Sequence, residues 1–295
     1  MRHGKPLSEV LAERLKGSVC SMNVGDDLFL GGFVGQGIQG VTLGVTGSGD
    51  PTLQQGVGPM GRTFHFNITP PTAQTAAYAA LQAPTNGVAL TLAAGAGITK
   101  TVAPDGSGAT VYLNDLCTLG PPPVYIGRCV SLTSVSNLSG ITFTLVGYDI
   151  YGRKTTATLA GPNNNTVNFK KAVASVVSIT PNATNAGTVS AGTADVFGFP
   201  YLVKNGSYVQ DIGWNATTGG STGANGQNNF ALDTGTLTSG DQTSPATAAT
   251  GDPRGTYAPS GASNGTTQLI AALHLDASQC GPNALLTSAI GVTPA

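Results

Sequence analysis

The chain has 295 residues, of which 40% are hydrophobic and only 9% are charged, and its formal net charge is −1. This length and apolar fraction suffice for one large domain or two smaller ones with a buried core, and they exclude intrinsic disorder, which combines low hydrophobicity with high net charge. The near-neutral charge gives no electrostatic basis for binding nucleic acid. So few charges instead suit a surface that is covered by neighbouring molecules or built from uncharged polar turns.

The first predicted element is a short helix over residues 7–16, with Gly17 as a natural stop. Its apolar residues recur at helical spacing between charged ones. A helix of about three turns is marginal alone in water, so it must pack on something. The sequence leaves two alternatives open, its own β-domain or a partner molecule, and for a partner the contact residues are Leu7, Val10, Leu11 and Leu15.

No segment reads as a signal peptide or a transmembrane helix. Charged residues such as Glu9 and Glu13 interrupt any apolar core near the N-terminus, and no window has the length and apolarity of a membrane span. We therefore expect synthesis in the cytoplasm and no membrane partner.

β-Strands are predicted through the N-terminal half. In residues 62–69, Phe64 and Phe66 alternate with polar residues, which is the period-two pattern of a strand with one buried face. Residues 95–108 are turn-rich, and the Pro-rich residues 119–123 form a stiff connector that we take as a domain boundary. The other strands predicted in this half are 28–46, 88–92 and 110–113.

The clearest periodicity follows the connector. Apolar and threonine residues alternate over 141–145, turn residues occupy 149–153, and a β-branched run resumes at 155–159, so this stretch is predicted to be a hairpin. Regular short strands separated by turns predict an all-β fold, a β-sandwich of the Ig-like or jelly-roll-like kind with extended N- and C-terminal arms. The further predicted strands are 124–132, 166–169, 172–179, 208–214 and 269–275.

Composition also divides the chain. Residues 215–265 are almost entirely Gly, Thr, Ser, Asn and Ala, and because a structureless loop of that length is unusual inside a compact domain, we expect it to lie against the surface or a partner. The predicted divisions are an N-terminal arm 1–20, an N-terminal β-region 21–119, a β-sandwich body 120–214, a loop region 215–265, and a C-terminal strand and arm 266–295.

Two short sequence patterns match motifs that bind nucleotides or supply nucleophiles. Residues 35–40 read G-x-G-x-x-G, but they open onto the β-branched run 41–46 where the motif needs a helix, and the later acidic residue is missing. Residues 219–223 read G-x-S-x-G within low-complexity sequence, without the strand and helix of a nucleophile elbow. We interpret both as chance matches and expect no cofactor.

Candidate ligating and reactive side chains are few. His3, His65 and His274 are too dispersed for a metal site, so no metal is expected. The cysteines are interpreted as small buried hydrophobic residues, with a disulfide between Cys117 and Cys129 as the alternative.

Lys170 and Lys171 follow an asparagine-rich turn, which raises the idea of an isopeptide crosslink. Such a crosslink needs an acid beside the lysine, and no acid is adjacent in the sequence. We therefore expect both lysines to be solvated.

Four segments carry a resemblance to a known group of proteins: GYDIYGRKTT at 147–156, NTVNFKKAVASVVSI at 165–179, ADVFGFPYLV at 194–203, and DQTSPATAATGDPRGTYAPSGASNG at 241–265. Together they resemble a signature of virion proteins encoded with the capsid genes of podovirus-type tailed bacteriophages. The signature contains no catalytic motif, so the resemblance implies a structural role in the virion and no catalytic, cofactor-binding or metal-binding residues. Within these segments we expect the structural anchors to be Tyr148, Tyr151, Phe199 and Tyr201.

The resemblance implies a non-enzymatic decoration or cement protein on the capsid exterior, made in the host cytoplasm. Its expected partners are the major capsid protein and further copies of itself, as a trimer or dimer. A tail, head-tail connector or fibre component is the alternative within virions. A glycan-binding module, suggested by Tyr208, Trp214 and Tyr257 near Asn-rich loops, is a second alternative, and an enzyme is the least favoured.

Overall fold

The structure, a computed structural model, describes residues 62–114, 116, 126–204, 206, 209–216, 232–248, 251–275 and 291–295. The regular elements in these ranges are β-strands, and no α-helix lies among them. The strands are β1 (Arg62–Ile68), β2 (Ala79–Gln82), β3 (Ile98–Val102), β4 (Thr110–Asn114), β5 (Arg128–Asn137), β6 (Thr142–Tyr148), β7 (Lys154–Ala160), β8 (Asn163–Val173), β9 (Ser175–Pro181), β10 (Val189–Gly198), β11 (Val209–Ala216), β12 (Thr236–Ser239), β13 (Gly255–Ala258) and β14 (Thr267–Leu275).

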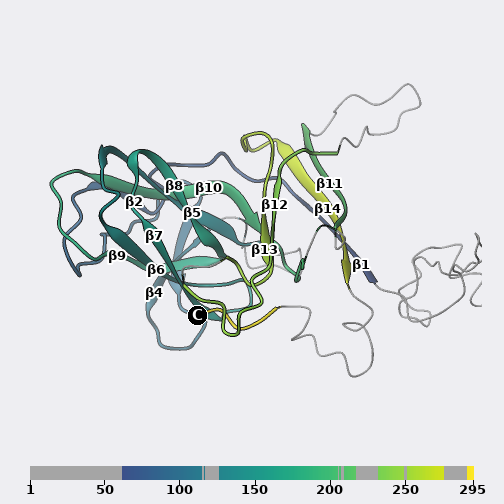
Figure 1. Cartoon of the computed structure of the whole chain (residues 1–295), viewed down its shortest axis with the longest axis horizontal. Coiled ribbons are helices and arrows are strands. Elements are labelled where there is room, and N and C mark those ends of the chain that lie inside the picture. The colour runs from purple at the N-terminus through teal and green to yellow at the C-terminus, as the bar shows by residue number, and fades with distance from the viewer. Residues whose placement is uncertain are drawn as a thin grey trace, which may run out of the picture. The chain divides into compact units, whose positions relative to one another are not determined.

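The strands form three sheets (Figure 1). One has the order β3-β4-β9-β6-β7, and another the order β12-β13-β10-β5-β8 with β2 also paired to β10. The third contains β1, β14 and β11. The chain forms two compact units, and the larger one, His65–Ala271 with Ile290–Ala295, contains both larger sheets and all the sites described below.

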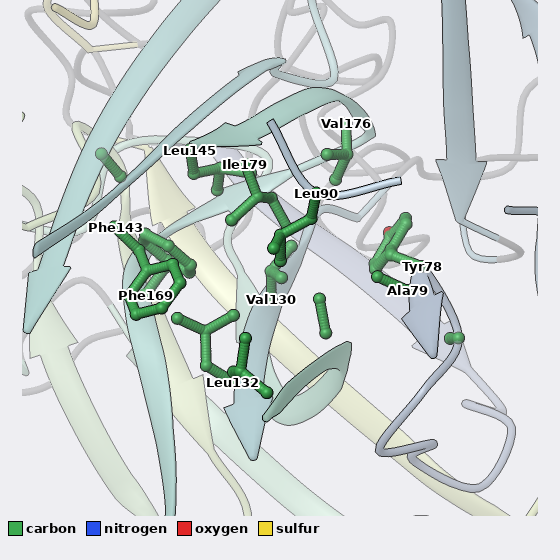
Figure 2. Packing of buried hydrophobic residues seen from close by; sticks show 14 of the residues in the cluster. Tyr78, Ala79, Leu90, Val130, Leu132, Phe143, Leu145, Phe169, Val176 and Ile179 are labelled. Carbon is green, nitrogen blue, oxygen red and sulfur yellow. The ribbon is translucent and has the colours of Figure 1, made fainter. Parts of the chain in front are cut away.

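The two larger sheets pack face to face as an all-β sandwich. Phe143 and Leu145 of β6 meet Val130 and Leu132 of β5 across the interface, with Phe169 of β8 beside them, and Figure 2 shows these side chains pointing toward one another. All five are fully buried. The alternation of apolar and polar residues along each strand therefore places one face of each sheet in the shared core.

One long extended segment links the sheets. β8 and β9 follow each other with only Ala174 between them, yet β8 pairs with β5 in one sheet and β9 pairs with β6 and β4 in the other. A chain that crosses between the sheets in this way closes one corner of the sandwich. The buried Val173 and Val176 lie on either side of the crossing and belong to the core.

The structure confirms the predicted hairpin, since β6 and β7 pair antiparallel from Thr142 with Ala160 to Tyr148 with Lys154. It also adds strands that the composition concealed. β3 lies within the turn-rich stretch 95–108, and β12 and β13 lie within the stretch 215–265 that was expected to be loop. The reason is that these segments gain hydrogen bonds from neighbouring strands, which outweigh their weak local β-propensity.

Residues on both sides of the Pro-rich connector share one core. Ala79, Leu90 and Ile98 pack in the same buried cluster as Val130 and Leu132. The sandwich therefore includes β2, β3 and β4 in addition to the predicted body. The helix at 7–16 and the strands at 28–46 lie outside the described residues.

The shared core makes a direct prediction about stability. Phe143 has no exposed surface, so Phe143→Ala removes a large side chain from between the sheets and leaves a cavity. We expect a loss of about 3–5 kcal/mol in the free energy of unfolding, measured by urea denaturation. Val135→Ala is the control, because Val135 is 80% exposed on β5 and its truncation should change stability by less than about 0.5 kcal/mol.

Candidate functional site

The turn of the β6–β7 hairpin is organised by Asp149. Its Oδ1 accepts hydrogen bonds from the backbone amides of Tyr151 and Arg153, both at 2.9 Å. Gly152 adopts a φ of +74°, a conformation that residues with a Cβ rarely take. An aspartate followed three residues later by glycine therefore fixes this turn.

Arg254 holds the other oxygen of the same carboxylate. Its Nη1 lies 2.9 Å from Asp149 Oδ2, and both side chains are only 2% exposed. Its Nε donates to the carbonyl of Phe199 at 3.1 Å, and its guanidinium lies 5.2 Å from the centre of the Tyr151 ring. This is a buried ion pair with a cation–π contact.

Asp252 extends the network to the crossing strand. Its Oδ1 accepts from the backbone amide of Arg254 at 2.8 Å and its Oδ2 from that of Ala172 at 3.0 Å. Burial raises the pKa of Asp252, against the opposing influence of Arg254 and these two amides. The phenol of Tyr151 donates to the carbonyl of Pro200 at 2.6 Å. The segments 147–156, 165–179, 194–203 and 241–265 thus meet in one buried network, with Asp149 and Arg254 at its centre.

A second arginine makes a similar contact on β5. Arg128 is 2% exposed, and its Nη2 lies 2.8 Å from Asp195 and 2.9 Å from Ser263. Its Nε and Nη1 donate to the carbonyls of Ala194 and Pro71. Its guanidinium lies 5.3 Å from the ring centre of Phe197. This contact joins the segment before β2 to β10 and to the loop before β14.

A cavity of about 300 Å³ lies beside Arg128, with Asn114, Gln74 and Thr193 in its wall. These groups are bonded to the protein itself. Asn114 Nδ2 donates to the carbonyls of Val173 and Ala174, and Thr193 Oγ1 accepts from the amide of Gln74. The cavity wall therefore joins strands of both larger sheets through its own hydrogen bonds.

Near the hairpin, Asp105 forms a smaller surface pair with Tyr148. The Tyr148 phenol donates to Asp105 Oδ2 at 2.5 Å, and the amide of Ser107 donates to Oδ1 at 2.9 Å. Hydrogen bonds from Ser107 and then from Tyr148 lower the pKa of Asp105 to about 2. The same contact raises the pKa of Tyr148.

The predicted anchors all lie near these contacts. Phe199 is 2% exposed and supplies a carbonyl to Arg254, while Tyr148 is 4% exposed and bonds Asp105. Tyr151 is 40% exposed on one side and contacts Arg254 on the other. Tyr201 is half-buried, and the pKa of Tyr151 is raised mainly by burial and further by its proximity to Tyr201. The predicted partner-contact residues at 7–15 lie outside the described residues.

The remaining sequence candidates are placed as follows. Cys129 has a free, buried thiol whose pKa is raised by burial. Lys170 is exposed as expected, but the prediction was wrong for Lys171, which is 1% exposed on the inner side of β8. The G-x-G-x-x-G and G-x-S-x-G spellings and Cys117 lie outside the described residues.

No three His, Cys, Asp or Glu side chains gather as metal ligands would in the part of the chain that the structure describes. Those ranges also contain no helix with the length and apolarity required to cross a bilayer. Comparison with protein-family models, curated proteins and solved structures finds no match to this chain.

Sequence reasoning did not single out Asp149, Arg254, Asp252 or Arg128. A signal was present for three of them, because charged residues are scarce in this chain and Asp149, Asp252 and Arg254 lie in the quoted segments, whereas Arg128 lies outside them. Their pairing could not be inferred, since Asp149 and Arg254 are 105 positions apart.

The central ion pair can be tested by removing its cation. Arg254→Met leaves the Asp149 carboxylate buried without its charge partner, so the free energy of unfolding should fall by about 3–5 kcal/mol in urea denaturation. The double variant Arg254→Met with Asp149→Asn should recover part of the loss. Lys170→Met, on the exposed side of β8, is the matched control and should behave as the unsubstituted chain. Equal stability of Arg254→Met and Lys170→Met would contradict the central role of the pair.

The lowered pKa of Asp105 predicts that the free energy of unfolding decreases at acidic pH. Its folded pKa of about 2 lies below its ordinary value of 3.8, so the contribution is present above about pH 4 and is lost as the pH falls toward 2. Asp105→Asn should flatten the decline of unfolding free energy over this interval. Tyr148→Phe removes only one donor and should flatten it less. The same acid dependence in Asp105→Asn and the unsubstituted chain would overturn this assignment.

Proposed function

We propose that this chain is a non-enzymatic structural protein of a tailed-phage virion, which binds the capsid exterior as a decoration or cement protein. Its partners are then the major capsid protein and other copies of itself, as a trimer or dimer. A protein that binds only the assembled lattice stabilises that lattice by mass action.

One observation carries this proposal. The four segments of the phage-like signature converge on the buried Asp149–Arg254 pair, where their polar groups bond to one another. Side chains used in this way hold strands in place and are not presented to a substrate. The placement of these segments in the scaffold supports a structural role over an enzymatic one.

The sandwich itself also supports the proposal. Both larger sheets share one core, and the loops between strands are tied down by side-chain caps such as those of Asp149 and Asp252. A rigid domain loses little conformational freedom when it docks, so small repeated contacts on a lattice suffice for binding.

Two alternatives remain proposals of lower rank. A tail, connector or fibre component would use the same scaffold. A glycan-binding module would need an exposed aromatic platform, whereas Tyr257 is 2% exposed with its phenol bonded to Asp233, and Trp214 packs near Phe197 with ring centres 6.4 Å apart. These contacts favour a scaffold role for both rings.

The copy number in purified virions tests the proposal. Quantitative mass spectrometry should give a ratio to the major capsid protein near one, or a simple lattice fraction such as one third, because a decoration protein occupies symmetric lattice positions. A dozen or fewer copies per particle would refute the cement role and favour the tail or connector. Absence from virions would refute both.

A further inference from the structure

A short extended segment, residues 291–295, lies beside β7 and the loop residues 246–248. The amide of Ala246 donates to the carbonyl of Thr293 at 2.9 Å, and the amide of Ala295 donates back to Ala246 at 2.6 Å. The amide of Thr156 on β7 donates to the carbonyl of Ala295 at 2.5 Å. The segment is therefore bound on two sides through main-chain hydrogen bonds, in the manner of an added strand.

The start of the segment is held by a side chain. Arg153 Nη1 lies 3.3 Å from the carbonyl of Gly291 and 3.1 Å from that of Val292. Gly291 has a φ of +77°, and a Cβ there would lie 2.7 Å from the carbonyl oxygen of Pro253. Gly291 and Pro294 are buried while Thr293 and Ala295 are exposed, so Gly291 and Pro294 face the protein. We call the residues that bind the segment, Arg153, Thr156 and Ala246, the acceptor site.

The acceptor site is held in place without the segment. Lys171 extends from the inner side of β8, and its Nζ donates to the carbonyl of Ala246 at 3.0 Å. The amide of Thr158 on β7 donates to the carbonyl of Ala248 at 2.8 Å. Lys171 is 1% exposed, and this burial lowers its pKa because the charged amine is more stable in water. The Lys171 hydrogen bond fixes Ala246, which lies at the centre of the acceptor site.

The residues between β14 and the segment are long enough for the segment to come from the same copy or from a neighbouring copy. Residues 276–290 separate β14 from the segment, and an extended chain of that length reaches on the order of 50 Å, about the diameter of a domain of this size. The segment of one copy can therefore reach the acceptor site of a neighbour.

We propose that the acceptor site receives residues 291–295 of a second copy of this chain, so that neighbouring copies exchange this segment. The occupant is specified by the contacts above: an extended main chain, glycine at the left-handed position, and small or proline residues facing inward. Exchange of an identical element adds an intersubunit contact while preserving every hydrogen bond made within one copy. The inference rests on the proposed function, because a symmetric shell places copies of the protein side by side.

A crosslinking experiment on the full chain tests the exchange. Ala246 and Pro294 are bridge partners, so cysteines at these positions lie opposite each other. One tagged chain carries Ala246→Cys alone and a second, differently tagged chain carries Pro294→Cys alone. After coexpression, purification and mild oxidation, we expect a disulfide-linked heterodimer on a non-reducing gel. Each single variant expressed alone controls for the native cysteines.

Two further variants complete the test. A chain that carries both Ala246→Cys and Pro294→Cys should contain neither introduced thiol in free form after oxidation, because the two cysteines can form a disulfide. If both thiols stay free, the docking of the segment itself is overturned. If that chain forms only an internal disulfide and the mixed chains form no heterodimer, the exchange is refuted. Adding Gly291→Ala to the Pro294→Cys chain should reduce the heterodimer several-fold, because the new Cβ meets Pro253. The experiment needs no virion, so its failure is distinguishable from a virion copy number that refutes the proposed function.

Discussion

The ion pair between Asp149 and Arg254 is the constraint on which much of the sandwich depends. Taking two charges out of water costs several kcal/mol per ion, and only complete bonding offsets that cost. Asp149 is bonded by two backbone amides and the guanidinium, and Arg254 contacts the carboxylate, the Phe199 carbonyl and the Tyr151 ring. The hairpin turn, the end of β10 and the loop before β13 must therefore adopt their positions together.

The distribution of charge follows the same principle. The chain has 13 Lys and Arg and 14 Asp and Glu residues, and several of these few charges lie inside the protein. Arg128 and Arg254 each contact a carboxylate, backbone carbonyls and an aromatic ring, and Lys171 contacts a carbonyl. Charge that is used to join strands is absent from the surface.

The two proposals are linked by the geometry of β7. Its hairpin partner β6 lies on one side, and its other side binds residue 248 and the segment 291–295. An edge strand left open invites uncontrolled pairing with other chains. An edge that accepts one specific segment instead allows a defined contact between copies, which is what a repeating shell requires.

The sequence by itself determined the fold class and the β6–β7 hairpin, because alternation along a strand and the turn residues at 149–153 are local signals. It did not locate β3, β12 or β13, whose stability comes from pairing with distant strands. It also predicted a solvated Lys171, although the side chain is buried, because the acceptor carbonyl of Ala246 is 75 positions away. Which charges pair depended on contacts between distant residues. The tertiary structure alone decided these pairs, because only folding excludes water from those charges and makes their pairing necessary.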